Sequence, residues 1–76
     1  MGSSASLSSV RRRIDRLDAQ LLRLVNRRAA FALLIGRIKR GRKWPVFDAR
    51  REAFVLRHVE RANRGPLSPR AVARIF

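Results

Sequence analysis

The chain has 76 residues and a formal net charge of +14, because 19 Lys and Arg stand against five Asp and Glu. It contains no Cys and a single His, which excludes disulfides, zinc–thiolate sites and a cysteine nucleophile and predicts neither a metal site nor a cofactor. Hydrophobic residues make up 46% of the sequence, too many for a disordered basic tail.

The first half of the chain predicts one long helix over about residues 8–40, after a flexible N-terminal tail at residues 1–6. Ser8 or Ser9 can cap this helix. Its apolar residues recur at steps of four and three, the pattern of a helix that packs on helices. They form what we call the apolar seam: Val10, Ile14, Leu17, Leu21, Leu24, Phe31, Ile35 and Ile38.

The predicted helix is ~50 Å long, whereas a compact domain of this size is only about 30 Å across. The remaining residues are too few to cover such a seam. We therefore expect the first helix to pack against a second copy of the chain.

The second half predicts two shorter helices. Gly41, Pro45 and the charged residues between them are expected to break the first helix. Asp48 is a good N-cap for a helix over about 48–64 that stops at the Asn63–Pro66 segment.

The third predicted helix opens with Ser68 as its cap and Pro69 at its first position, and covers 69–76. Because this helix begins with a complete cap but has only two turns, it is expected to be truncated. The whole of residues 7–76 thus predicts a single all-α domain.

The apolar seam has a gap at Arg28, where a permanent cation replaces the expected apolar residue. Lys39 lies three turns later, within about 20° of the same face. Two cations on one stripe describe a pocket for an anion, although both side chains could equally extend into water. Arg11 lies about 25 Å before Arg28 along the helix, so it can reach the same small ligand only from another subunit.

Two more candidates lie at the start of the second helix. Asp48 is explained by its capping role alone, whereas Glu52 lies one turn further in and can reach a ligand hydroxyl. Arg51 belongs to the same turn. His58 has no second metal ligand at a suitable spacing and is interpreted as a surface or packing residue.

The order of these residues resembles the all-helical chorismate mutase family. The resemblance rests on an ordered set of residues with its spacings and covers residues 7–76. The set comprises Val10-Arg11, Ile14-Asp15, Leu17-Asp18, Leu21-Leu22, Leu24, Asn26-Arg27-Arg28, Gly36, Lys39, Pro45-Val46, Asp48 and Arg51-Glu52. The segments 62–67 and 73–76 are similar to mutase domains fused to the N-terminus of prephenate dehydratase or of the synthase that opens the shikimate pathway.

The resemblance implies an intertwined homodimer of three-helix chains that converts chorismate, a dianion, to prephenate in aromatic amino acid biosynthesis. Arg28 and, from the partner chain, Arg11 would hold the two carboxylates, and Lys39 would approach the ether oxygen. Glu52 and the backbone near Asp48 would contact the ring hydroxyl, with Arg51 lining that end.

This rearrangement needs no nucleophile, metal or proton shuttle, which suits the residue inventory. The family's polar residues on the third helix are missing, so the resemblance implies a weakly active or inactive chain. Three alternatives stay open: an isochorismate pyruvate-lyase in the same fold, a non-catalytic dimerisation module and a basic nucleic-acid binder. The sequence disfavours nucleic acid because, beyond Trp44 and four Phe, it lacks stacking aromatics.

No uncharged run is long enough to cross a bilayer, and residues 1–10 lack the apolar core of a signal peptide. A cytoplasmic location without membrane contact is therefore expected.

Overall fold

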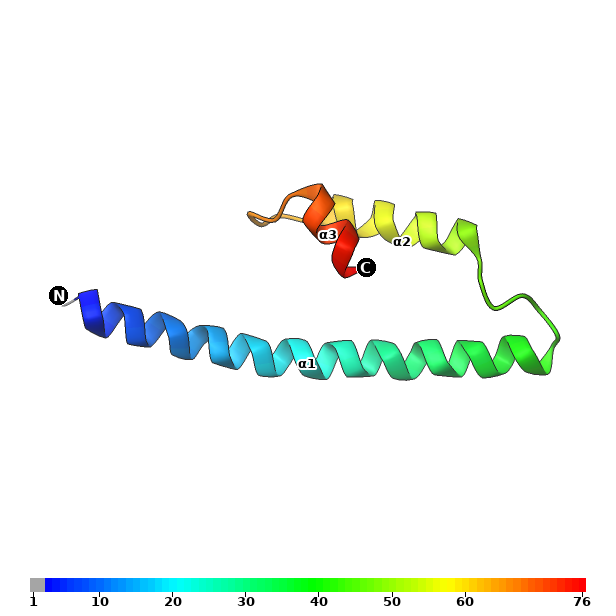
Figure 1. The fold of residues 1–76 in the computed structure, drawn as a ribbon, viewed down its shortest axis with the longest axis horizontal. Helices are drawn as coiled ribbons and strands as arrows, with labels where there is room; N and C mark the ends of the chain where they lie inside the picture. The colour runs from blue at the N-terminus through cyan, green and yellow to red at the C-terminus, as the bar shows by residue number, and fades with distance from the viewer. Residues whose placement is uncertain (1–2) are drawn as a thin grey trace. The chain divides into compact units, whose positions relative to one another are not determined.

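A computed structural model describes residues 3–76, which form three α-helices and no strand (Figure 1). The helices are α1 (Ser3–Gly41), α2 (Ala49–Ala62) and α3 (Pro69–Ile75). The chain divides into two units, Met1–Trp44 and Pro45–Phe76. The predicted all-α class, with one long helix followed by two shorter ones, is confirmed.

The N-terminal end of α1 differs from the prediction. The helix begins at Ser3, so residues 3–6 are helical instead of belonging to a flexible tail. Ser8 and Ser9 lie inside the helix and do not cap it. Because this segment has no Gly or Pro and includes Ala5, extending a helix that is already nucleated costs little free energy. Residues 1–2 of the expected tail lie outside the described part of the chain.

The C-terminal end of α1 is closed by Lys43, one of the charged residues between Gly41 and Pro45. Lys43 has a φ of 56°, its N–H donates to the Arg40 carbonyl at 3.1 Å, and the Trp44 N–H donates to the Lys39 carbonyl at 2.7 Å. This pair of bonds is a Schellman motif, which usually places Gly in the left-handed position. Gly41 is the last helical residue and has no positive φ. The left-handed residue, Lys43, lies within the 41–45 segment that was expected to break the helix.

Capping fixes both ends of α2. The Asp48 Oδ1 atom accepts from the backbone N–H groups of Arg50 at 3.0 Å and Arg51 at 3.2 Å, which confirms Asp48 as the N-cap. Beyond the last helical residue, the Asn63 side chain accepts from the Gly65 N–H at 3.1 Å and donates to the Leu67 carbonyl at 2.8 Å. The helix thus ends two residues before the predicted boundary at 64 because Asn63 already belongs to the turn.

The short helix α3 packs on α2 within the second unit. Ser68 caps it, as predicted, by accepting from the Ala71 N–H at 3.1 Å, and Pro69 occupies its first position. Val72 is the only buried hydrophobic residue among those whose side chains are described, with 5% of its surface exposed. It has half-buried neighbours in the same unit, which are Val55, Leu56, Val59 and Ala71. This small cluster is the core of the unit.

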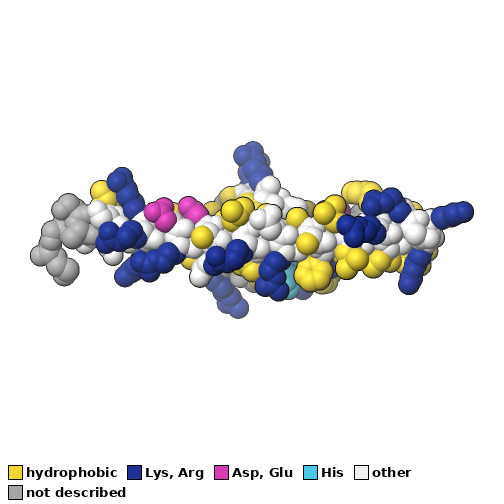
Figure 2. Space-filling model, turned by 90° about the horizontal axis from the view of Figure 1, so that it is seen from below, with side chains coloured by type: hydrophobic (Ala, Val, Ile, Leu, Met, Phe, Trp, Pro, Cys, Tyr) yellow, Lys and Arg dark blue, Asp and Glu magenta, His cyan; other side chains and the backbone are white. Residues whose placement is uncertain are grey.

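The apolar seam of α1 is not buried in the single chain. Its eight side chains are between 46% and 60% exposed, and Figure 2 shows hydrophobic side chains at the surface along α1, with Lys and Arg side chains standing out around them. No helix in residues 3–76 is long and apolar enough to cross a lipid bilayer. Exposed apolar surface on this scale marks an interaction site.

Candidate functional site

Two of the predicted site residues lie on one face of α1. Arg28 and Lys39 are eleven residues apart, so they are separated by ~16 Å along the helix axis and by about 20° around it. Arg28 is exposed and Lys39 is half-buried. From Asp18 to its end at Gly41, α1 carries six Lys and Arg and no further acidic residue, so this part of α1 presents strongly positive potential to an anion.

Arg11 lies on the same helix but far from that pair. It is exposed, and the continuity of α1 from Ser3 to Gly41 keeps it ~25 Å from Arg28 along the axis. One small ligand cannot bridge these two side chains on the same helix. Within a single chain, therefore, the structure does not bring Arg11 and Arg28 together.

The other three predicted residues, Asp48, Arg51 and Glu52, share the first turn of α2. The carboxylate of Asp48 accepts hydrogen bonds from two backbone N–H groups. A ligand at this end of α2 would therefore contact the backbone near Asp48 and not its carboxylate. Glu52 is exposed in the first turn, where its negative charge is favoured by the helix dipole. The Arg51 guanidinium lies 5.2 Å from the centroid of the Phe54 ring.

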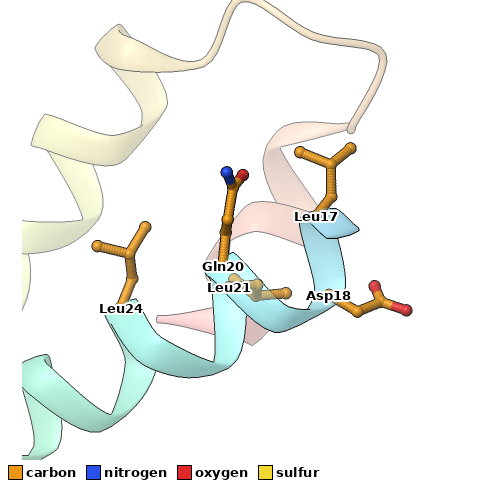
Figure 3. A pocket seen from close by; sticks show the side chains of 5 residues that line it. All are labelled: Leu17, Asp18, Gln20, Leu21 and Leu24. Atoms are coloured by element: carbon orange, nitrogen blue, oxygen red, sulfur yellow. The ribbon is translucent and has the colours of Figure 1, made fainter. Parts of the chain in front are cut away.

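The sequence analysis missed the depression on α1 that Figure 3 shows. It is lined by Leu17, Asp18, Gln20, Leu21 and Leu24. The side chains of Leu17, Gln20 and Leu24 rise on the same side of the helix, whereas Asp18 points away. Gln20 also lines a neighbouring depression with Arg23, Leu24 and Arg27.

Gln20 could have been found from its position, three residues after Leu17 and four before Leu24, which places it beside the apolar seam. It is the only Gln of the chain, and its amide offers both a donor and an acceptor to a partner. The missed signal was a polar residue on an otherwise apolar face.

Residues 10–76 match the family described as chorismate mutase type II. The chain belongs to this family. It is 38% identical over 81 residues to the bifunctional chorismate mutase/prephenate dehydratase of Pseudomonas aeruginosa, covering the whole of this chain and 22% of that protein. It is 44% identical over 66 residues to the protein of the same name from Neisseria gonorrhoeae, covering 87% of this chain and 18% of that protein.

A third similar protein, the bifunctional chorismate mutase/prephenate dehydratase of Aquifex aeolicus, is 38% identical over 58 residues, which are 76% of this chain and 16% of that protein. The chain thus spans about a fifth of the length of the first two curated relatives. No solved structure matches it significantly.

The chemistry available to this family member is that of fixed positive charge on stiff helices. Among the described residues, no group of three or more His, Asp or Glu is placed to hold a metal ion. Arg28 and Lys39 on α1 can attract and orient an anion, and the first turn of α2 adds Glu52 as a hydrogen-bond acceptor.

Proposed function

We propose that this chain is a chorismate mutase that rearranges chorismate to prephenate. The observation that carries the proposal is the family match over residues 10–76. The matched range includes all six candidate residues, and Arg11 is its second residue. In this reaction the ether C–O bond breaks while a C–C bond forms. No proton or electron is exchanged with the protein, so positioning and electrostatics supply the catalysis.

In the proposed site, Arg28 binds one carboxylate of the substrate and Lys39 approaches the ether oxygen, where negative charge develops. Glu52 and the backbone near Asp48 contact the ring hydroxyl, and Arg51 lines that end. The position of Arg28 and Lys39 on one face of α1 supports these roles because a straight helix holds both cations without reorganisation during the reaction.

The active form in this proposal is a homodimer, in the cytoplasm, whose subunits are built from residues 7–76. The exposed seam of α1 supports dimerisation, since a second copy can cover it. Arg11 then reaches the site of the partner subunit, which agrees with its distance of ~25 Å from Arg28 in its own helix.

The direct test follows chorismate consumption and prephenate formation by the Arg28→Leu variant. We expect kcat/KM to fall by at least about 30-fold, because a desolvated charge pair with the substrate is lost, while the far-UV circular dichroism stays helical. Arg27→Leu is the matched control, since it removes the same charge one residue away, ~100° around the helix. Equal activity of the two variants would contradict the proposed site.

Supplying isochorismate and measuring released pyruvate tests the sister activity of the same fold. Pyruvate release from isochorismate, without turnover of chorismate, would replace the proposed reaction with the lyase reaction.

A mixing experiment tests the shared site. Arg11→Ala and Arg28→Ala chains are each expected to be inactive, but a heterodimer has one site in which both residues are intact. Mixing should restore about half of the wild-type activity per heterodimer. If activity stays absent although subunit exchange is demonstrated, the two residues do not meet across the dimer.

A further inference from the structure

The helix α2 has two faces of different chemistry. Toward α3 it presents Val55 and Val59, which are half-buried. On the opposite side lies a set of exposed residues, which we call the outer stripe and which falls within about 60° around the helix. The outer stripe consists of Arg50, Phe54, Arg57 and Arg61.

An aromatic pair lies at the middle of the outer stripe. The rings of Phe54 and His58 are stacked with centroids 6.0 Å apart and an angle of 4° between their planes. On the N-terminal side, the Arg51 guanidinium lies 5.2 Å from the Phe54 centroid. Phe54 is 50% exposed and His58 is exposed, so a row of planar groups is open to a ligand that stacks.

The positive charge of the outer stripe is extended. Arg50, Arg57 and Arg61 spread over ~16 Å of helix, which suits several anionic groups in a row better than one small anion. Neither Glu52 nor Glu60 lies on the stripe, since Glu52 is about half a turn away from it and Glu60 about a quarter of a turn. The stripe itself therefore carries no carboxylate, and Glu60 lies beside it as the i+3 neighbour of Arg57.

We propose that the outer stripe of α2 binds single-stranded nucleic acid, with its arginines on the phosphates and a base stacked against the Phe54–His58 pair. Aromatic rings interleaved with cations are the usual means of binding single strands without sequence preference. The proposed face lies beside the mutase site: Glu52 faces away from the stripe, whereas Arg51, which lines one end of the proposed mutase site, also contacts Phe54. The ring pair supplies a stacking surface that the sequence did not reveal.

Two other polyanionic partners fit this face less well. A helix that lies on an anionic membrane needs a row of large apolar residues, whereas the outer stripe has only Phe54. An acidic peptide would pair with the arginines but would leave the stacked rings without a role. The combination of flat rings and spaced arginines is what favours nucleic acid.

The test measures binding of a fluorescent oligothymidylate by anisotropy at several salt concentrations. The triple variant Arg50→Gln/Arg57→Gln/Arg61→Gln should bind at least about tenfold more weakly, with a salt slope smaller by about 2, because each phosphate contact on a single strand contributes about 0.7 to the slope. The matched control is Arg64→Gln/Arg70→Gln/Arg74→Gln, which removes the same charge from outside the stripe and should weaken binding less than about threefold.

The role of the ring is tested by Phe54→Leu, which keeps an apolar side chain and removes the stacking surface. We expect oligothymidylate binding to weaken by about fivefold or more. An equal loss in the two triple variants, or no effect of Phe54→Leu, would overturn the proposal. So would inorganic polyphosphate of equal charge binding as tightly as the oligonucleotide, or anionic phosphatidylserine vesicles displacing it from the stripe.

Discussion

The turn that follows α1 predicts that a glycine substitution increases the stability of the protein, because Lys43 has a positive φ. Replacing Lys43 with Gly should stabilise the protein, because a residue with a Cβ in the left-handed conformation costs about 1–2 kcal/mol. The greater freedom of Gly in the unfolded chain offsets part of this gain, by roughly 0.5–1 kcal/mol. The net increase in the free energy of unfolding is expected to be about 0.5–1 kcal/mol.

Gly41→Ala is the companion variant. Gly41 has no positive φ, and a Cβ added there would meet no atom within 4 Å. Alanine should therefore fit and stabilise the end of the helix by up to about 0.5 kcal/mol. Had Gly41 been the left-handed residue of the turn, the same substitution would destabilise the protein.

Thermal unfolding followed by far-UV circular dichroism measures both effects. For a chain of this size, 1 kcal/mol corresponds to about 4–8 °C in Tm, so Lys43→Gly should raise Tm by ~2–8 °C at fixed protein concentration. Lys43→Ala removes the charge but keeps the Cβ, and it should leave Tm nearly unchanged. A lower Tm for Gly41→Ala, or no increase for Lys43→Gly, would refute the account of this turn.

Three further substitutions test the second unit. Asp48→Ala should lower the free energy of unfolding by about 1 kcal/mol, whereas Asp48→Asn keeps an accepting oxygen and should lose little, as judged by urea unfolding. Asn63→Ala removes two hydrogen bonds of the turn and should lower the free energy of unfolding by about 1–2 kcal/mol. Amide hydrogen exchange at Gly65 should become faster, because its N–H loses its acceptor. Val72→Ala should cost about 1–2 kcal/mol by removing apolar contact between α2 and α3, and nuclear magnetic resonance shifts should change in both of these helices.

The accuracy of the sequence predictions depended on whether the physical cause was local. Asp48 and Ser68 cap their helices through side-chain hydrogen bonds to backbone N–H groups two or three positions away. Asp and Ser are both preferred N-cap residues, so the residue type alone predicts this role. Lys43 gives no such signal, because nothing in its chemistry favours a positive φ. The end of α1 was therefore predicted for the 41–45 segment as a whole, and the residue within it that takes the left-handed conformation was not predicted.

In the candidate site too, the features with a local cause were predicted and the others were not. The spacing of Arg28 and Lys39 on one helix follows directly from helical periodicity, as does the separation of Arg11 from both. The stacking of Phe54 on His58 was missed, although residues at i and i+4 are neighbours on a helix, because His58 was interpreted as a surface or packing residue without a named partner. How residues on α1 meet residues on α2 depends on contacts between distant parts of the chain, which no local pattern specifies.

The exposed seam of α1 also has a consequence for the kinetics of folding. The helices α2 and α3 are joined by a short turn, so their packing requires little chain entropy and can proceed within a single molecule in microseconds to milliseconds. In the proposed homodimer, covering the seam with a second copy is instead a second-order step whose rate rises with protein concentration. Because each chain carries a charge of +14, the two approach against mutual repulsion, and added salt should accelerate this encounter by screening it.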